Sequence, residues 1–389
     1  MTLSACPSRS LSARPRLAPA QTPSRRLARP TPLALALALA LALWGASGAV
    51  RRAAASPWLL PPGAVTLSAR YDYAYARDEF LASTGRLTPF SLNGQYSANT
   101  YSLGARLGLS EWLELEVSLP LREVTYQSDP VILNPTALSG EAAYDHYQRN
   151  ILNFNQSAVG VADVGLAARL RLMTAPLVMS LELGVTAPAG YAPPEGTFGD
   201  RPASVKAFVS DVGRYVAPEN IRDDVTLGDG AFAFTPMLHA GLGTGGGFFA
   251  RASGGLRVRL NGAGDALVGE LKAGQSLRPW LLVFVGLAGE KAVTRGRVIG
   301  VSVAAKDATL PAADYGDPRL LELIEVTLDR DLLSLPIGLL VRPQRDVELG
   351  VNYAQVLWGR NVAKSHVLSV GVTVLTSYLQ ARAPLNGRR

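Results

Sequence analysis

The sequence of 389 residues contains one cysteine, Cys6, and only three histidines. A single cysteine cannot close an intrachain disulfide, and so few cysteines and histidines do not supply the spaced ligand sets of structural zinc sites. Glycine loops that cradle phosphate and the strand-turn-helix elbow of hydrolases are also missing. We therefore expect no metal, no cofactor and no enzymatic activity.

Long apolar runs are nearly absent as well. The one continuous run, Leu33–Trp44, has 12 residues, fewer than the about 20 that a membrane-spanning helix requires. Six arginines precede this run, and small residues from Ala46 to Ala49 follow it. A basic start, a short apolar stretch and small-residue cleavage sites form the pattern of a secretory signal peptide. We predict a signal peptide at residues 1–55, cleaved between 48 and 55, with a membrane-anchored signal as the alternative.

A surplus of positive charge is lacking once this segment is removed. The whole sequence has a formal net charge of +7, but residues 1–55 hold eight arginines and no acidic residue. The remainder has 30 basic and 31 acidic residues, a net charge of −1. Nucleic-acid binding needs a basic patch on the folded domain, so no nucleic-acid partner is expected.

After residue 55, the dominant pattern is an alternation of apolar and polar residues, which is typical of strands with two different faces. Between Leu113 and Leu119, for example, every second residue is leucine or valine, and Glu114, Glu116 and Ser118 lie between them. No stretch of similar length has a helical period. Twelve alternating segments occur, at 64–77, 96–109, 112–125, 159–173, 177–187, 231–242, 248–260, 265–277, 281–293, 332–342, 346–358 and 365–378.

The spacers between these segments alternate in length. Short turns at one rim, longer loops at the other and an even strand count are typical of outer-membrane barrels. We predict an all-β fold at 56–378, a transmembrane antiparallel up-and-down β-barrel of about 12 strands with long extracellular loops and short periplasmic turns. Residues 379–389 would be a periplasmic tail. The longest predicted loops are 78–95, 126–158, 188–230 and 294–331.

Three prolines, Pro120, Pro236 and Pro336, fall inside predicted strands, where proline cannot donate a ladder hydrogen bond. Each would mark a bulge or a strand end, so ten or fourteen strands are alternatives. A water-soluble β-sandwich also alternates, but the export signal, the loop lengths, the strand lengths and aromatic residues near strand ends favour the barrel. These aromatic residues are Tyr73, Tyr75, Tyr101, Trp112, Tyr126, Trp280, Trp358 and Tyr378.

Four sets of motifs occur in the predicted strands and turns: Leu60–Gly63 leading into Val65–Tyr75, Tyr101–Gly104, Leu109–Leu115 continuing to Leu119-Pro120, and Gly160–Leu166 followed by Leu183–Gly190. In these motifs the chain resembles the outer-membrane family named for the MetA pathway of phenol degradation. The resemblance covers about residues 60–378 and consists of turns and periodicity. It implies a transporter that admits hydrophobic or aromatic compounds, and it offers no defined functional residues to transfer.

If the apolar face of the strands meets lipid, the polar face lines the lumen, because lysine or arginine facing lipid at mid-bilayer costs about 2–4 kcal/mol. The charges either pair and fill a narrow interior, or line a water-filled path whose fields orient solutes. We expect mutual pairing with partial water filling. The candidate lumen-lining residues are Arg70, Asp72, Arg106, Glu114, Glu116, Asp163, Arg169, Arg171, Glu182, Arg251, Arg257, Arg259, Glu270, Lys272, Glu290 and Glu348.

Two loops are candidate gates. In 306–331, Asp317-Pro318 has the chemistry of a helix N-cap and first position, and a mostly apolar stretch, 320–324, follows. A short helix is expected there, either as a plug in the mouth or packed on the rim. Segment 205–216 has the same two interpretations. Its apolar residues include Phe208, Val212 and Tyr215.

His366 is the basis of the one enzymatic alternative. Outer-membrane phospholipases have about twelve strands and use serine and histidine on the barrel exterior, and Ser365 and Ser369 lie near His366 in sequence. A catalytic pair needs hydrogen-bond reach and an orienting partner, which closeness in sequence does not supply. An interfacial histidine is therefore favoured over a lipid hydrolase.

The sequence thus predicts an exported protein of the cell outer membrane. Its expected partners are outer-membrane lipid, the barrel-assembly machinery and a small hydrophobic solute. The assembly machinery usually reads a terminal aromatic residue, and Tyr378 has this place although 379–389 follow it. The main hypothesis is passive passage of a small apolar or aromatic solute, gated by 188–230 and 294–331. A closed barrel with a structural or surface-binding role is the alternative.

Overall fold

The computed structural model describes residues 58–132, 151–152, 155–191, 203–210 and 226–377. The predicted signal peptide, the tail, Tyr378 and the gate residues Val212 and Tyr215 lie outside these ranges. None of the described helices is long and apolar enough to cross a membrane. Helix in this part of the chain comprises α3 (Val205–Ser210) and the 3-10 turns η1 (Ser91–Asn93), η2 (Leu260–Gly262) and η3 (Ala312–Gly316).

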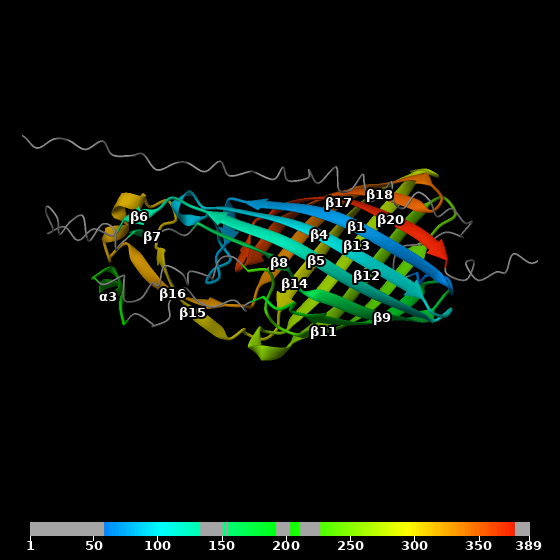
Figure 1. Ribbon diagram of the computed structural model, residues 1–389, viewed down its shortest axis with the longest axis horizontal. Helices are drawn as coiled ribbons and strands as arrows, with labels where there is room; N and C mark the ends of the chain where they lie inside the picture. The colour runs from blue at the N-terminus through cyan, green and yellow to red at the C-terminus, as the bar shows by residue number, and fades with distance from the viewer. Residues whose placement is uncertain (1–57, 133–150, 153–154, 192–202, 211–225, 378–389) are drawn as a thin grey trace, which may run out of the picture.

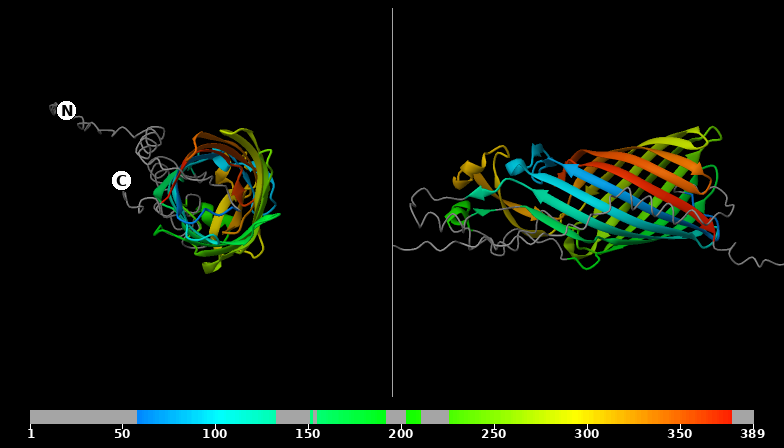
Figure 2. Two further views of the ribbon diagram at one scale, coloured as in Figure 1. Left: turned by 90° about the vertical axis from the view of Figure 1, so that its right-hand side faces the viewer. Right: turned by 45° about the horizontal axis from the view of Figure 1, so that its top comes forward.

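A closed antiparallel barrel makes up most of the structure (Figures 1 and 2). β20 pairs with β1 and closes the wall. β8 and β9 are two parts of one wall strand, because β8 pairs with the end of β5 and β9 with its start. The wall therefore has twelve strands, which confirms the predicted fold. They are β1 (Ala64–Ala76), β4 (Gln95–Gly108), β5 (Leu113–Gln127), β8 (Gln156–Val161) with β9 (Val164–Met173), β10 (Val178–Ala187), β11 (Ala233–Gly243), β12 (Phe248–Arg259), β13 (Ala266–Arg278), β14 (Leu281–Ala292), β17 (Asp331–Gln344), β18 (Val347–Arg360) and β20 (His366–Ser377).

The alternation in the sequence becomes the two faces of this wall. In the β4–β5 ladder, Arg106 lies opposite Glu116 and Leu107 lies opposite Leu115. Leu115 is 41% exposed on the outer face, whereas Glu114 beside it is fully buried on the inner face. An apolar exterior and a polar interior suit a bilayer, because lipid does not solvate charged groups.

Short turns join the strands at one end of the barrel and longer segments at the other (Figure 1). In outer-membrane barrels the short-turn end is periplasmic, and we name the two ends accordingly. The extracellular end also carries three small sheets. They are β2 (Asp78–Phe80) with β3 (Leu87–Pro89) and β19 (Val362–Ala363), β6 (Val131–Ile132) with β7 (Ile151–Leu152), and β15 (Val298–Ala305) with β16 (Leu321–Thr327).

Each of the three strand prolines interrupts the ladder of the wall. At Pro120 the partner of β5 changes from β9 to β8, and the Ala162 N–H donates to the Pro120 carbonyl at 2.9 Å. Pairing is also interrupted at Pro236 on β11 and at Pro336 on β17. Proline has no N–H to donate, so all three mark breaks inside strands, and none of them ends a strand.

The expectation of an apolar helix in the 306–331 loop is wrong. Leu321–Thr327 is strand β16, which pairs with β15 in a hairpin beyond the extracellular rim (Figure 1). The Asp317 carboxylate accepts the Arg319 N–H at 2.9 Å, and this bond closes a local turn instead of capping a helix. Short apolar runs do not distinguish strand from helix by period, and the apolar, partly β-branched sequence of β15 supplies the pairing partner.

Candidate functional site

The inner face of the wall carries a connected set of ion pairs in the periplasmic half of the lumen. At its centre, fully buried Glu114 accepts hydrogen bonds from Arg106 Nε at 2.8 Å, Arg169 Nη1 at 2.9 Å and the Leu60 N–H at 2.7 Å. A carboxylate removed from water needs such partners, because burying it unpaired is costly. Glu114 therefore joins β5 to β4, to β9 and to the segment that precedes β1.

Arg169 extends this set across the next strands. Its Nε donates to Glu182 on β10 at 3.1 Å, and its Nη2 lies 3.3 Å from Glu116. Glu182 in turn contacts Nε2 of His239 on β11 at 3.1 Å. These contacts span five wall strands, and we call the set the periplasmic cluster. Its members are Arg106, Glu114, Glu116, Arg169, Glu182 and His239.

Smaller ion pairs line other strands of the wall. Lys272 also lies over the ring of Phe284, with Nζ 4.8 Å from the ring centroid. The pairs are Arg70–Asp72 at 2.8 Å, Arg251–Glu270 at 2.7 Å, Lys272–Glu270 at 2.8 Å and Arg342–Glu348 at 2.7 Å.

Near the extracellular end, arginines gather around Glu290. This carboxylate is 7% exposed and pairs with Arg257 at 3.0 Å, with Arg330 at 3.5 Å and with Arg259. Arg259 is itself buried, with 2% of its side chain exposed. Arg122 on β5 belongs to the same half of the lumen. We call Arg122, Arg257, Arg259 and Arg330 the rim arginines.

Residues 226–231 enter this half of the lumen from the loop before β11. Leu227 is 7% exposed and packs against Ala98, Val124 and Ala162 of the facing wall. A Cβ on Gly160 would lie 2.7 Å from Leu227 Cδ1, so glycine makes room for the leucine. The half-buried side chains around this apolar patch are Ala74, Tyr96, Tyr126, Ala158 and Tyr191. The expectation that Tyr126 belongs to the outer aromatic belt is therefore wrong.

Asp229 follows Leu227 and points toward the rim arginines. Its carboxylate lies 3.4 Å from Arg259 Nε and 3.8 Å from Arg330 Nη1. The Asp229 N–H is bonded to the Asp163 carboxylate, which also accepts the Tyr191 hydroxyl. Burial and the neighbouring Asp163 raise the pKa of Tyr191, which lies beyond β10, so this phenol stays protonated and donates.

The residues before β1 occupy the opposite end of the lumen. Leu60 is fully buried, and the Gly63 N–H donates to the Gly108 carbonyl at 2.8 Å. The Trp58 ring lies 3.8 Å from the place of a Cβ on Gly243. Gly243 ends β11, which is nearly opposite β1 in the wall. Residues 58–63, which we call the N-terminal strap, therefore cross the periplasmic mouth.

The structure brings most of the predicted lumen residues into these ion pairs. Asp163 is hydrogen-bonded at the extracellular end, whereas Arg171 is half-buried on the polar face of β9 and contributes to none of the pairs described above. That these residues line a solute path stays a prediction. Within the described residues, no group of three or more His, Cys, Asp or Glu side chains could hold a metal ion.

Sequence reasoning missed several residues of the periplasmic cluster and of the extracellular half of the lumen. Arg122 shares the parity of Glu114 and Glu116 on one strand, so the same alternation could have identified it. His239 lies on a strand whose alternation is obscured by Pro236. Asp229, Arg330 and Tyr191 lie outside the wall strands, where no alternation of the sequence predicts which way a side chain points.

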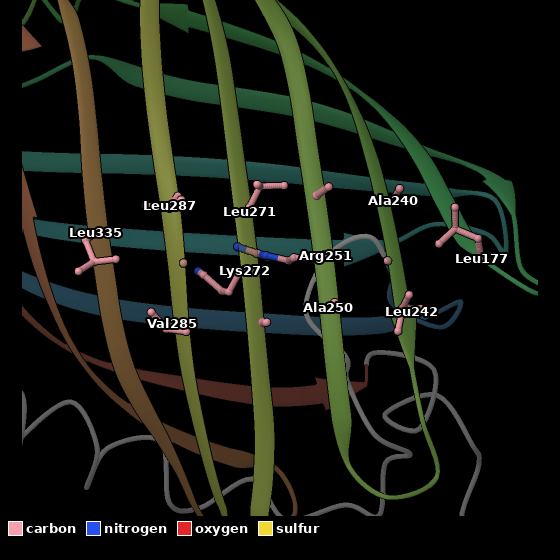
Figure 3. A pocket seen from close by; sticks show the side chains of 14 residues that line it. Leu177, Ala240, Leu242, Ala250, Arg251, Leu271, Lys272, Val285, Leu287 and Leu335 are labelled. Atoms are coloured by element: carbon pink, nitrogen blue, oxygen red, sulfur yellow. The ribbon is translucent and has the colours of Figure 1, made fainter. Parts of the chain in front are cut away.

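The outer face carries an apolar groove of about 590 Å³ between β11 and β17 (Figure 3). Leu271, Leu287 and Val285 border it and are 57%, 41% and 47% exposed. The small side chains of Ala240 and Ala250 also line it (Figure 3). It lies in the belt that would face lipid, and acyl chains are the expected contents.

His366 lies on the outer face beside aromatic residues. Its Nδ1 is 2.7 Å from the Tyr353 hydroxyl. Ser369 lies three residues later on β20, on the opposite face, and is only 5% exposed. The geometry therefore makes His366 an interfacial residue and does not pair it with Ser369 for nucleophilic catalysis.

No family model and no curated protein matches the sequence. Among solved structures, a crystal structure of an outer-membrane channel from Pseudomonas putida F1 is similar, with a TM-score of 0.51 and 13% identity over 83% of this chain and 100% of that chain. The CymD monoaromatic hydrocarbon channel has a TM-score of 0.36 and 9% identity over 82% of this chain and 89% of that chain. The KdgM porin bound to oligogalacturonate has a TM-score of 0.36 and 6% identity over 78% and 98%. The first similarity identifies the fold as that of an outer-membrane barrel, and the other two are too weak to add to it.

Proposed function

We propose that the protein is an outer-membrane channel that lets a small solute pass through the barrel lumen. The observation that carries this proposal is the closed wall with charged and polar side chains on its inner face. Water and a passing solute can solvate charged and polar side chains on an inner face, whereas lipid cannot. The similarity of fold to an outer-membrane channel supports the same function.

The solute class in this proposal is small and at least partly apolar or aromatic. Its support is the unequal lining of the extracellular half, where Ala98, Val124 and Tyr96 form a mostly apolar wall opposite Arg257, Arg259 and Arg330. The resemblance to the MetA-pathway family agrees with such a solute. A uniformly hydrated pore for sugars would not need the apolar wall.

A specific observation favours a second function, a closed structural barrel. Chain segments occupy both ends of the lumen, and Leu60 and Leu227 are 0% and 7% exposed there. If these segments never leave, the protein would serve as a scaffold for its extracellular sheets.

Conductance in planar bilayers distinguishes the two functions. We expect small current steps from the wild type and larger steps from the double variant Leu227→Ala/Asp229→Asn, because its substitutions shorten or neutralise the side chains that occupy the extracellular half of the lumen. Leu271→Ala, on the lipid-facing side, is the matched control and should behave as the wild type. Silence from both the wild type and the double variant would rule out the channel and establish the closed barrel.

A further inference from the structure

Leu227 and Asp229 together occupy the extracellular half of the lumen as a small amphipathic acid would. The isobutyl group of Leu227 fills the apolar patch of Ala98, Val124 and Ala162. Two residues later, the Asp229 carboxylate is directed at Arg259 and Arg330. The space inside this half of the barrel is therefore complementary to a molecule with an apolar body at one end and a single carboxylate at the other.

The charged side of this space has spare capacity for an anion. Nε of Arg122, of Arg259 and of Arg330 are each buried without a hydrogen-bond partner in the described part of the chain. Buried N–H groups without acceptors are costly, and guanidinium groups bind carboxylates best when two N–H groups point at two oxygens. Asp229 lies 3.4 Å from Arg259 Nε and 3.8 Å from Arg330 Nη1, distances that are too long for strong hydrogen bonds.

The contacts that Leu227 and Asp229 make with the wall are weaker than the contacts among the surrounding wall residues. The Leu227 carbonyl accepts a 3.4 Å hydrogen bond from Arg122 Nη1, whereas Arg122 Nη2 donates to the Tyr96 hydroxyl at 2.7 Å. The Asp229 side chain is 28% exposed, so water competes for it. Gly228 fits only because it has no Cβ, which would overlap the Tyr191 hydroxyl and the Asp163 carboxylate. The backbone there is tightly seated, but the two side chains contribute little.

We propose that this half of the lumen is a binding site for small aromatic or branched aliphatic monocarboxylates, which take the places of the Leu227 and Asp229 side chains. The ring or branched chain would lie on Ala98, Val124 and Ala162, beside Tyr96. The carboxylate would lie between Arg259 and Arg330. This inference rests on the proposed function, because it names the chemical class of the solute.

The charge of the resident side chain favours a monocarboxylate as its replacement. Asp229 presents one carboxylate to Arg259 and Arg330. A monocarboxylate in the same place supplies the same single negative charge in a group of the same planar shape. A neutral ligand would leave the arginine N–H groups without acceptors.

Calorimetric titration of the detergent-solubilised protein tests the site without a membrane. The probes are benzoate, its neutral counterpart benzamide, and acetate, which has the carboxylate but no ring. We expect benzoate to bind Leu227→Ala/Asp229→Asn at least about tenfold more tightly than the wild type, because the internal competitor is removed. Benzamide and acetate should bind at least about tenfold more weakly than benzoate.

Arginine variants in the double-variant background assign the carboxylate position. Arg330→Gln should weaken benzoate binding by about tenfold or more, whereas Arg319→Gln, on the exposed hairpin loop, should leave it unchanged. Each variant is first shown to fold by its heat-dependent shift in gel mobility. We expect Arg330→Gln to pass this test, because Arg330 precedes β17 and lies outside the wall strands. Equal binding of benzamide and benzoate would overturn the proposal, and so would benzoate binding that neither the double variant nor Arg330→Gln alters.

The two proposals fail separately. A protein that conducts in bilayers but does not distinguish benzoate from benzamide retains the channel function and loses this site. A protein that binds benzoate as expected but never conducts retains the site and loses the channel function.

Discussion

Segments of the chain occupy both ends of the lumen, but they are held by different means. At the periplasmic end, the strap bonds through the Leu60 N–H to Glu114, which has no solvent exposure, and through Gly63 to the backbone of β4. At the extracellular end, Asp229 is 28% exposed and lies 3.4 and 3.8 Å from its arginines.

Occupying a lumen and closing it are therefore separate properties of a chain segment. Exposed ion pairs contribute about 0–1 kcal/mol, whereas breaking a buried pair costs about 3–5 kcal/mol. The periplasmic strap is therefore part of the folded wall. The side chains of Leu227 and Asp229 are occupants that a solute can replace.

The largest expected effect is on stability at the periplasmic end. Glu114→Ala leaves Arg106 and Arg169 without their shared buried carboxylate, and we expect a loss of about 3–5 kcal/mol in the free energy of unfolding. Asp229→Ala should cost less than about 1 kcal/mol. Urea unfolding in lipid vesicles, followed by tryptophan fluorescence, measures both.

Glu325→Ala, on the exposed extracellular hairpin, is the control for removing a carboxylate from a solvent-exposed pair. Equal losses for Glu114→Ala and Asp229→Ala would remove the distinction between the two ends.

The second expected effect is on conductance. A Cβ on Gly108 would overlap the Pro61 carbonyl oxygen and lie 2.9 Å from that of Leu60. Gly108→Val should therefore displace the strap and open the periplasmic mouth, and its effect on single-channel conductance should exceed that of Leu227→Ala/Asp229→Asn. Gly245→Val, in a periplasmic turn where nothing lies within 4 Å of an added Cβ, is the matched control. Conductance equal to that of the control would mean that the strap does not limit passage.

Much of the fold could be predicted because the membrane imposes a period of two on every wall strand. Leu115 and Glu114 must face opposite sides, and this requirement is readable in sequence. The proline breaks agree with the same rule, since Pro120 is accommodated by a change of partner strand. The helix expected at 317–324 failed because a short apolar run carries no clear period, and pairing with β15 decided its structure.

The candidate site could be predicted only on its wall side. The strand arginines Arg257 and Arg259 follow from parity. Asp229 and Leu227 do not, because loop residues have no period and reach the lumen through tertiary contacts with Val124 and Tyr191. The strap was assigned to the barrel region, but no local pattern shows that Leu60 enters the lumen to meet a glutamate 54 residues later.

The smallest expected effect is a pH response at the extracellular end. Burial raises the pKa of Glu79 on β2 from 4.5 to about 7, so the folded rim sheet binds a proton that the unfolded segment releases. The stability of this sheet should therefore fall as the pH rises from about 4.5 to about 7. Hydrogen exchange at Phe80 and Ala363, corrected for intrinsic rates, should show protection that decreases over this window in the wild type and stays constant in Glu79→Gln. Glu325→Gln should retain the wild-type decrease. The strap amides at Leu60 and Gly63 should not change over the same window, and a parallel decrease there would mean that the two ends do not respond independently.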